Sequence, residues 1–350
     1  MAGSRTRSAP RHKKDWDGNV YGLALVGQGG IGFVFAIDEE RVVKIPAGSD
    51  VSVRAFRRER AAFKILGTGV QSKYLLTCLD YHLRDRLVLE RCVGTVRERL
   101  QEQASAIGNG SPRWQHEELM KCSVTWAYQA AEGLSFVHSK NIVHADVGCH
   151  NLLLDDHDNV KISDFSGSPI PKKDQGYLPA LVSYDTRSRK PGTSGATKET
   201  DIFALGSVIY ELATGHLPYF DLPDEQVTGL FATWKWPDDM TSIRTEYPVM
   251  AVSILDCWEG DIGDAREIAI DLKPEEMHNL SFYQSNTPLP RTPGISSTSS
   301  YSSSSSNDTG SDEKQTTRKR RRRKKKKPEI SLFSRLRSYF NHGWAPITDS

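Results

Sequence analysis

The amino-terminal third of the chain alternates apolar and polar positions in the manner of β-strands. Between Leu23 and Pro46, apolar segments flank a glycine-rich turn, and Phe33 to Ile37 and Val42 to Ile45 are rich in strand-forming residues. The residues between these two segments, D-E-E-R, predict a hairpin turn. Tyr74 to Tyr81 and Arg86 to Arg91 predict two more strands. We therefore expect a small five-stranded antiparallel sheet.

The apolar residues farther along the chain are spaced for helices. Arg54 to Leu66 and Glu117 to Ser139 each repeat apolar residues at helical spacing, which gives a helix one apolar face. Ser105 to Arg113 is rich in glycine, asparagine, serine and proline, and it predicts a loop. Strand-rich sequence followed by helix-rich sequence predicts the α+β class, with a small β-sheet lobe and a larger, mainly helical lobe.

The two ends of the chain lack such patterns. The first residues are polar and basic, and from Gln284 onward serine, threonine and proline dominate, so neither end can build a core. We expect a disordered basic amino-terminus (1–17), one folded domain (18–280, with lobes 18–91 and 92–280) and a disordered tail (281–350).

Charge is distributed unevenly between the expected fold and the tail. The formal net charge is +2, but the tail contains ten consecutive basic residues, Arg318 to Lys327. Without that run, 36 basic residues stand against 44 acidic ones, a net charge of −8. An acidic fold argues against a nucleic-acid-binding domain, and we expect no sequence-specific nucleic-acid partner. Attraction to polyanions is therefore expected only in the tail.

The basic run has more than one interpretation. A block of this kind is typical of a nuclear-import signal, so we expect a nuclear-import receptor as a partner. The alternative is weak contact with an anionic membrane through residues 318–340, because apolar residues after the run fall at helical spacing beside Arg335 and Arg337. A merely solvated tail is the third interpretation.

Cysteine usage and the amino-terminus bear on the compartment. The five cysteines form no C-x-x-C pair, which is typical of reduced intracellular thiols. The first residues lack the apolar core of a signal peptide, and no run of about 18 apolar residues occurs. We expect a soluble intracellular protein, nuclear or cytoplasmic.

The stretch from Ile142 to Phe165 carries the densest candidate chemistry. It reads I-V-H-A-D-V-G-C-H-N-L-L-L-D-D-H-D-N-V-K-I-S-D-F, and its apolar triplets predict two short strands of a hairpin. Asp146 is followed five residues later by Asn151, and Asp164 comes beyond the hairpin. Three oxygen ligands in this arrangement can surround a phosphate-bound Mg²⁺, which is the chemistry of phosphoryl transfer.

This stretch resembles the catalytic loop H-R-D-x-x-x-x-N and the metal-binding D-F-G of eukaryotic protein kinases. Here they are written H-A-D-V-G-C-H-N and D-F-S, with Ala145 in place of the arginine and Ser166 in place of the glycine. By this resemblance Asp146 accepts the proton of the substrate hydroxyl, while Asn151 and Asp164 hold Mg²⁺. The altered motifs also resemble those of divergent kinases in filamentous fungi.

The glycine-rich turn fits the same family. Gly27, Gly29 and Gly32 match G-x-G-x-x-G-x-V, with Val34 at the last position. A dinucleotide-binding turn is the competing interpretation, but there the third glycine opens a helix, whereas here strand follows strand. The kinase form is therefore favoured, with backbone N–H groups closing over the phosphates of ATP.

The resemblance implies an ATP site built from both lobes. Lys44 would hold the phosphates as a point charge, with Glu59 pairing to it. The alternatives are a solvated strand lysine and an ordinary surface glutamate. Phe63, one turn after Glu59, would join an apolar stack with His144 and Phe165. The other residues implied at the ATP site are Val42, Leu89, Glu90, Cys92 and Leu153, with the backbone of Glu90 to Cys92 on the adenine edge.

Ser166 to Ala196 lacks periodicity and fits an activation segment. The A-P-E that usually closes this segment is replaced by T-R-S-R-K-P-G, and the arginine that usually pairs with its glutamate is not evident. A paired replacement is expected, because one buried charge left alone would cost about 3–5 kcal/mol. Thr200 to Thr214 resembles the central helix of the large lobe, in which Asp201 would accept hydrogen bonds from the catalytic-loop backbone.

The motifs, taken in order across residues 18–280, imply an ATP- and Mg²⁺-dependent protein kinase. Gly148 and His150 match neither the Lys of Ser/Thr kinases nor the Arg of Tyr kinases, so Ser/Thr specificity is expected by frequency alone. The rival interpretation is a non-catalytic scaffold of the same fold, supported by Ala145, Ser166 and Gly148. Against it, no residue implied to contact ATP, metal or the substrate hydroxyl is missing.

Overall fold

The structure is a computed structural model in which residues 16, 18–67, 72–107, 112–169, 171–172, 176–177 and 186–274 are described. The chain divides into two compact units, Met1–Met277 and His278–Ser350, and every described residue belongs to the first. The basic run and the expected tail lie outside the described residues.

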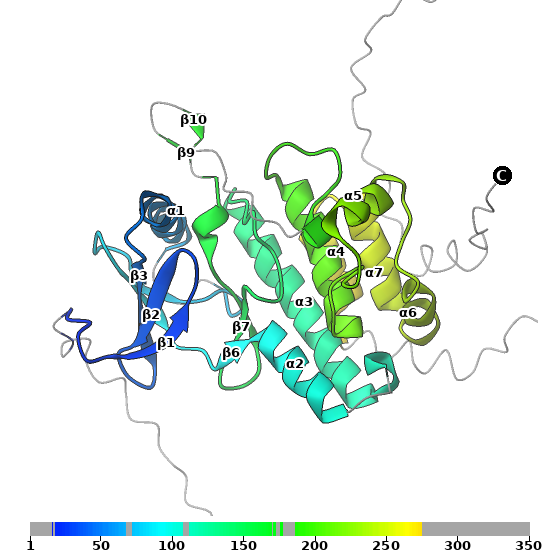
Figure 1. Ribbon diagram of the computed structural model, residues 1–350, viewed down its shortest axis with the longest axis horizontal. Coiled ribbons are helices and arrows are strands. Elements are labelled where there is room, and N and C mark those ends of the chain that lie inside the picture. The colour runs from blue at the N-terminus through cyan, green and yellow to red at the C-terminus, as the bar shows by residue number, and fades with distance from the viewer. Residues whose placement is uncertain are drawn as a thin grey trace, which may run out of the picture. The chain divides into compact units, whose positions relative to one another are not determined.

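A five-stranded antiparallel sheet forms the first lobe, as the sequence predicts, with strand order β1-β2-β3-β5-β4 (Figure 1). The last two strands are shorter than the predicted segments. One reason is that Leu75 leaves the sheet and bridges to Ile162 of the second lobe. The strands are β1 (Ala24–Gln28), β2 (Gly32–Ala36), β3 (Arg41–Pro46), β4 (Cys78–Asp80) and β5 (Leu87–Glu90).

Helix α1 (Asp50–Leu66) follows β3 and begins before the predicted start at Arg54. The reason is a cap. The Ser49 hydroxyl accepts a hydrogen bond from the backbone N–H of Ser52 at 3.1 Å, and Asp50 adds an acidic side chain to the positive end of the helix. The local serine and aspartate therefore extend the helix by a full turn.

The second lobe is mainly helical. Helix α3 (Glu117–Ser139) has the predicted bounds. Helix α4 (Lys198–Thr214) begins just before its predicted start, after a capping box in which the side chains of Thr197 and Thr200 bond reciprocally to each other's backbone N–H. The prediction of a loop from Ser105 was wrong for its first residues, because α2 (Val96–Ile107) continues through them.

Shorter elements complete this lobe. Strands β7 and β8 form the predicted hairpin, and β6 pairs with β7. Helices α5 and α6 were not predicted, since each is too short to show a clear apolar period. The elements are β6 (Gly94–Thr95), η1 (Arg113–Gln115), β7 (Leu152–Leu154), β8 (Val160–Ile162), η2 (Phe165–Gly167), β9 (Pro171–Lys172), β10 (Gly176–Tyr177), η3 (Thr186–Ser188), α5 (Asp224–Ala232), α6 (Met240–Glu246), α7 (Pro248–Glu259) and α8 (Ala265–Asp271).

The core of the second lobe is built around α4. All of its residues from Thr200 to Thr214 are buried, and α3 and α7 pack against it. Trp258 of α7 stacks on Trp236 with ring centroids 5.1 Å apart and contacts Phe203 of α4. Because Asp201 lies in the first turn of α4, this core fixes the acid beneath the catalytic loop.

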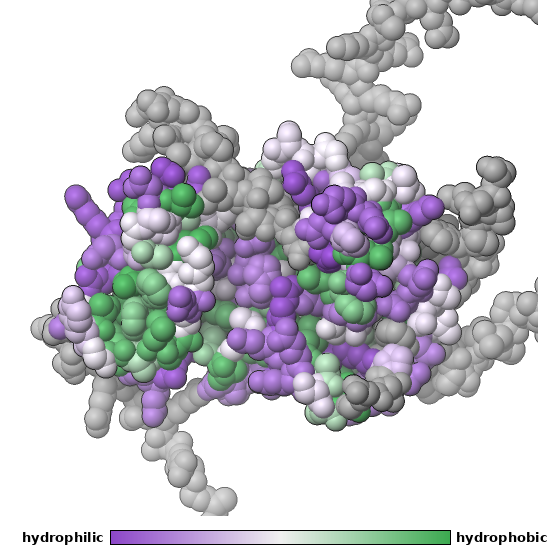
Figure 2. All heavy atoms as spheres, viewed as in Figure 1, coloured by the Kyte–Doolittle hydropathy of each residue, from purple (hydrophilic) through white to green (hydrophobic). Residues whose placement is uncertain are grey.

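Apolar side chains also reach the surface of the first lobe. Figure 2 shows hydrophobic side chains gathered over β1 and β2, where Leu25 and Val26 are about half exposed. Phe33 and Phe35 lie on the same face of β2, with ring centroids 6.5 Å apart. Within the described part of the chain, no helix is long and apolar enough to cross a membrane.

Candidate active site

The catalytic loop is held from below by Asp201. Its carboxylate accepts hydrogen bonds from the backbone N–H of His144 at 2.7 Å and of Ala145 at 2.9 Å, as expected from the sequence. The ring of His138 contacts the same carboxylate at 2.9 Å. Ala145 has a φ of 68°, a left-handed conformation that is costly for a residue with a side chain. Two hydrogen bonds to Asp201, whose carboxylate also contacts His138 of α3, therefore hold the loop in this conformation.

Asp146 and Asn151 are joined directly. The Asn151 side-chain N–H donates to Oδ2 of Asp146 and to its backbone oxygen, each at 2.9 Å. The backbone oxygen of Asn151 accepts hydrogen bonds from both the N–H and the hydroxyl of Ser163. The loop carrying Asp146 is thereby tied to the residue that precedes Asp164.

Asp164 stands at the entry to the turn η2. It also has a left-handed backbone (φ 58°), and its Oδ1 accepts a hydrogen bond from the backbone N–H of Ser166 at 3.1 Å. Ser166 does not have a positive φ. The serine that replaces the glycine of the kinase motif is therefore compatible with this backbone.

Lys44 contacts two carboxylates at once. Its Nζ lies 2.8 Å from Oε2 of Glu59 and 3.3 Å from Oδ2 of Asp164. Lys44 and Glu59 are both buried, which excludes the alternatives of a solvated lysine and a surface glutamate. The sequence-predicted pair is therefore formed in the structure.

Lys44 and Asp164 stabilise each other's charged form. Burial alone would lower the pKa of Lys44, but the carboxylates of Asp164 and Glu59 outweigh it and raise that pKa. Burial would likewise raise the pKa of Asp164, but the Lys44 ammonium and the hydrogen bonds of Ser166 hold it at about 2. Burial raises the pKa of Glu59, an effect that Lys44 opposes. Lys44 and Asp164 are therefore charged at neutral pH.

The expected apolar stack connects the two lobes. The rings of Phe63 in α1 and Phe165 in η2 meet edge to face, with centroids 5.4 Å apart. The ring centroid of His144, in the catalytic loop, lies 5.0 Å from that of Phe165. The Nε2 atom of His144 contacts the backbone oxygen of Ser163 at 2.8 Å. This stack places α1, with Glu59, against the loop that carries Asp164.

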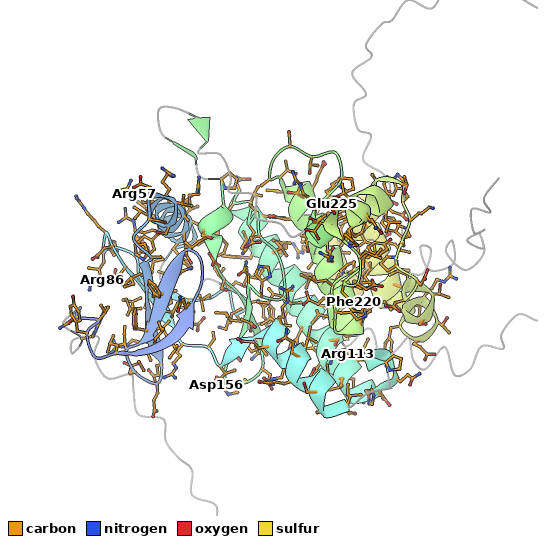
Figure 3. All side chains as sticks on the ribbon, viewed as in Figure 1. Arg57, Arg86, Arg113, Asp156, Phe220 and Glu225 are labelled. Atoms are coloured by element: carbon orange, nitrogen blue, oxygen red, sulfur yellow. The ribbon has the colours of Figure 1, made fainter. Side chains whose placement is uncertain are left out.

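The end of the activation segment is anchored by residues that the sequence analysis did not single out. Arg187 donates to Oδ1 of Asp224 at 2.7 Å and to the backbone oxygens of Tyr219 and Leu222. The Thr186 hydroxyl donates to the other oxygen of Asp224. Asp224 opens α5, just before Glu225, which Figure 3 labels.

These contacts provide a different ion pair from the one missing in the sequence. The sequence signal for Arg187 was the motif T-R-S-R-K-P-G, in which basic residues stand where the acidic A-P-E motif is usual. Its partner could not be read from the chain, because Asp224 lies in an unpredicted helix 37 residues away from Arg187. Arg187 and Thr186 thus join η3 to α5.

The glycine-rich turn lies between β1 and β2. A Cβ on Gly32 would be 2.4 Å from the backbone oxygen of Ile45, so only glycine fits there. The N–H of Gly29 donates to the oxygen of Gly32 at 3.0 Å and closes the turn. Gly27 pairs with Val34 across the two strands at an irregularity in the register.

The register of the sheet places Val34 and Val42, two residues implied at the ATP site, on the same face as Lys44. Val34 pairs with Lys44, and Val42 lies two residues before Lys44, so their side chains share a face. Leu153 of β7 is half-buried between two fully buried neighbours, so its side chain faces away from the core of the second lobe. Glu90 lies three positions along the paired register from Lys44, so its side chain points to the opposite face.

The backbone N–H groups of the linker between the lobes are not all paired within the described residues. The N–H groups of Arg91 and Val93 donate to the backbone oxygens of Glu40 and Leu154. The N–H of Cys92 finds no acceptor among the described residues. It is therefore available to a ligand, which agrees with the role that the kinase resemblance implies for the backbone of Glu90 to Cys92.

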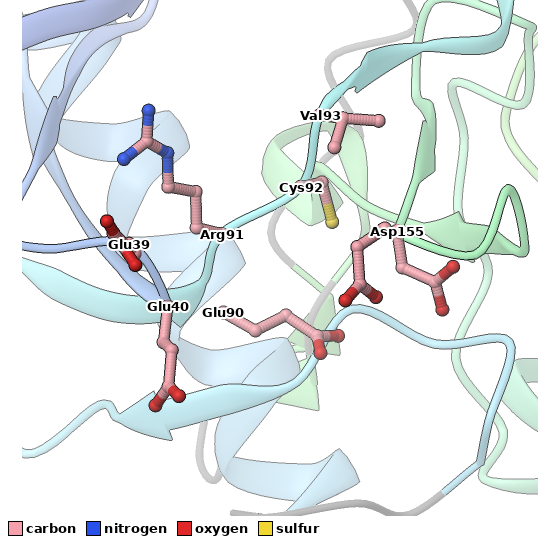
Figure 4. Close-up of a pocket in the computed structure, with 8 residues that line it drawn as sticks. Glu39, Glu40, Glu90, Arg91, Cys92, Val93 and Asp155 are labelled. Carbon is pink, nitrogen blue, oxygen red and sulfur yellow. The ribbon is translucent and has the colours of Figure 1, made fainter. Parts of the chain in front are cut away.

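A pocket lined by acidic side chains lies beside this linker (Figure 4). The carboxylate of Glu90 is already engaged there by the N–H of Thr77 at 2.6 Å and by Lys161 at 3.3 Å. The acidic wall of this pocket would repel a triphosphate. The pocket is lined by Glu39, Glu40, Glu90, Arg91, Cys92, Val93, Asp155 and Asp156.

The donor set at the catalytic loop fits Mg²⁺. Asp164 offers a carboxylate, and Asn151 offers its amide oxygen, because both hydrogen bonds of its side chain use the nitrogen. Hard oxygen ligands of this kind, few in number, are typical of Mg²⁺ bound together with phosphates. The same residues were predicted as the metal ligands, and the structure brings them together through Ser163.

The segment that carries these motifs matches a known protein family. Residues 23–235 match the family model described as protein kinase domain. This match spans more than half of the chain. The chain belongs to the protein kinase family.

Individual relatives match over shorter segments. CBL-interacting serine/threonine-protein kinase 2 of Arabidopsis thaliana is 38% identical over 112 residues, which cover 29% of this chain and 24% of the relative. CBL-interacting protein kinase 10 of Oryza sativa subsp. japonica is 35% identical over 127 residues, 33% of this chain and 27% of the relative. A probable CTD kinase subunit alpha homolog of Encephalitozoon cuniculi is 36% identical over 92 residues, 26% and 28% of the two chains. The matches span about a quarter of each relative's length.

Proposed function

We propose that this protein is an active protein kinase that transfers the γ-phosphoryl group of ATP to serine or threonine hydroxyls of protein substrates. Two series of polar contacts carry this proposal. One runs from Glu59 through Lys44 to Asp164, and the other runs from Ser163, the neighbour of Asp164 in the chain, through Asn151 to Asp146. The name of the Oryza sativa relative contains protein kinase, which supports protein substrates. The name of the Arabidopsis thaliana relative contains serine/threonine-protein kinase, which supports serine and threonine as acceptors.

Each residue has a distinct task in this proposal. Lys44, held by Glu59, fixes the ATP phosphates electrostatically. The carboxylate of Asp146 orients the substrate hydroxyl and accepts its proton as the phosphoryl group transfers. Asn151 and Asp164 would hold Mg²⁺, which neutralises phosphate charge when bound. The free N–H of Cys92 would bind the adenine edge, with Val34, Val42 and Leu153 as apolar contacts to the ring.

Two observations support an active enzyme over the rival function, a non-catalytic scaffold. Ser166 keeps the hydrogen bond to Asp164. Ala145 keeps its backbone contact with Asp201. Neither substitution removes a group that contacts phosphate, metal or the substrate hydroxyl. The remaining departure, Gly148, leaves the reacting groups in place.

The test is phosphate transfer by purified protein with labelled ATP, Mg²⁺ and generic protein substrates, comparing wild type with Asp146→Asn and Lys44→Met. We expect each variant to lose transfer while it remains folded. Lys44→Met should unfold at a lower temperature than wild type, because it leaves the buried carboxylate of Glu59 without its cation. Phosphoamino-acid analysis of the product should give phosphoserine and phosphothreonine. Equal transfer by wild type and Asp146→Asn would refute the proposal and favour the scaffold.

We further propose that Arg318 to Lys327 binds a nuclear-import receptor and directs the protein to the nucleus. The support is ten contiguous positive charges in a segment whose composition cannot build a core. A fluorescent fusion lacking residues 318–327 should become cytosolic, and so should one with the run replaced by glutamine. A fusion that moves instead from the plasma membrane to the cytosol would favour binding to anionic lipid.

A further inference from the structure

His150 and Gly148 of the catalytic loop form a matched pair. A Cβ on Gly148 would lie 2.5 Å from Cε1 and 2.6 Å from Nδ1 of the His150 ring. Real atoms do not approach so closely, so the imidazole occupies the space that any other side chain at position 148 would need. The absence of a side chain at 148 is therefore what allows this position of the ring.

The ring reaches the carboxylate that is proposed to accept the substrate proton. Nε2 of His150 lies 3.5 Å from Oδ2 of Asp146, the same oxygen that accepts the side-chain N–H of Asn151 at 2.9 Å. All the side-chain contacts found for Asp146 among the described residues fall on Oδ2. Oδ1 is left for another partner.

The pair is also open to an incoming protein. The His150 side chain is 40% exposed, whereas that of Asp146 is 16% exposed. The imidazole therefore lies at the surface, next to the carboxylate that a substrate hydroxyl would have to reach. Contacts in a free enzyme often lengthen and then shorten when the substrate binds, so 3.5 Å is within reach of a hydrogen bond in the complex.

We propose that His150 is a positioning residue for phosphoryl transfer. Together with Asn151 it holds Oδ2 of Asp146, so that Oδ1 faces the substrate hydroxyl, and its exposed ring edge contacts the substrate segment that carries this hydroxyl. Gly148 is required because it leaves room for the ring. This inference rests on the proposed kinase activity.

A double-mutant cycle tests the pair. His150→Ala should lower kcat by about tenfold or more, with the KM for ATP unchanged, because the misplaced carboxylate affects the reacting geometry and not nucleotide binding. Gly148→Ala should have a similar effect, because its methyl group displaces the ring. The double variant should be no slower than His150→Ala alone. Wild-type kcat in His150→Ala, or losses that multiply in the double variant, would overturn the proposal.

Conservative replacement separates positioning from a merely structural role. His150→Gln keeps a donor at a similar reach and should recover part of kcat, whereas His150→Phe keeps the ring shape without a donor and should not. His157→Ala, on the exposed turn between β7 and β8, is the matched control and should leave kcat unchanged. Equal kcat in the Gln and Phe variants would contradict the role of the donor.

A spectroscopic measurement distinguishes failure of this inference from failure of the kinase assignment. The Cε1–H resonance of His150 should move in Asp146→Asn and stay in Asp156→Asn, whether or not the protein turns over. Absence of that movement refutes the contact itself. Equal transfer by wild type and Asp146→Asn refutes the kinase activity instead, and with it the positioning role, even where the resonance moves.

Discussion

The backbone N–H of Ala145 donates to Oδ1 of Asp201 at 2.9 Å, and Asp201 is fully buried. Ala145 stands where protein kinases usually carry an arginine, yet its backbone has the left-handed conformation that places Asp146 at the site. The loop geometry therefore depends on the acid beneath it and not on the side chain at 145.

Replacing Asp201 with asparagine should destabilise the protein. The amide nitrogen would face a donor instead of accepting from it, and loss of charge-assisted hydrogen bonds to buried donors costs about 2–4 kcal/mol. In a domain of this size we expect Tm to fall by about 5–15 °C. Differential scanning calorimetry measures it, with the exposed Asp221→Asn as control. Equal Tm in the two variants would show that the loop does not need the buried acid.

Arg187 should matter more to stability than its acidic partner. Asp224 is 62% exposed, and exposed ion pairs contribute about 0.2–1 kcal/mol. The Arg187 side chain is only 13% exposed and also donates to two backbone oxygens, so Arg187→Ala should cost about 1–3 kcal/mol. Urea unfolding of Arg187→Ala and Asp224→Ala measures which variant loses more stability, with the exposed Arg189→Ala as the control. If Asp224→Ala is as costly as Arg187→Ala, the ion pair alone carries the anchor.

Glu259 should make stability depend on pH. Burial and the nearby carboxylates of Asp261 and Asp256 raise its pKa to about 7, against the opposing hydrogen bond from Trp236. As pH rises from 4.5, the ordinary pKa, to about 7, the unfolded chain releases a proton that the folded chain keeps, so stability falls across this window and stays lower above it.

Glu259→Gln should therefore be more stable than wild type at about pH 8, by about 1–2 kcal/mol after solvent screening, and no more stable at about pH 4.5. Urea titrations at the two pH values measure the difference. The exposed Glu246→Gln should show no such change. A Glu259→Gln gain of the same size at both pH values would point to packing and not to ionisation.

Activity should not depend on phosphorylation of the activation segment. The arginine beside the catalytic aspartate usually pairs with the loop phosphate, and Ala145 cannot. Six residues from Ser168 to Ser188 carry hydroxyl groups that could accept a phosphate, and two of them, Ser168 and Ser188, are buried. The other four are Tyr177, Thr186, Ser183 and Tyr184, of which the last two lie outside the described residues.

Phosphatase-treated protein should therefore keep its initial rate within about twofold, and so should a variant with these six residues replaced by Ala or Phe. Because Ser168 and Ser188 are buried, the same variant without those two replacements controls for misfolding. A loss of tenfold or more, about 1.4 kcal/mol, that returns on rephosphorylation of this segment would contradict the prediction.

Much of the fold and the candidate site follows from local sequence. The alternating strands, the helix from Glu117 and the hairpin after Asn151 show their periods within a few residues, because side-chain direction repeats with the backbone. The carboxylate and amide side chains expected for phosphoryl transfer lie in one short stretch of sequence. Asp146, Asn151 and Asp164 can therefore be named from the sequence alone. The cap at Ser49 was also legible in principle, from Ser and Asp before an apolar run.

The tertiary structure alone decided which distant residues complete the site. Arg187 meets Asp224 only because α5 packs beside the end of the activation segment, and no local pattern marks Asp224 as its partner. The ring of His150 folds back over Gly148 because the loop turns there, a placement that spacing does not predict. Contacts of this kind depend on how the packed elements meet, whereas the periods in the sequence report only which face of each element is apolar.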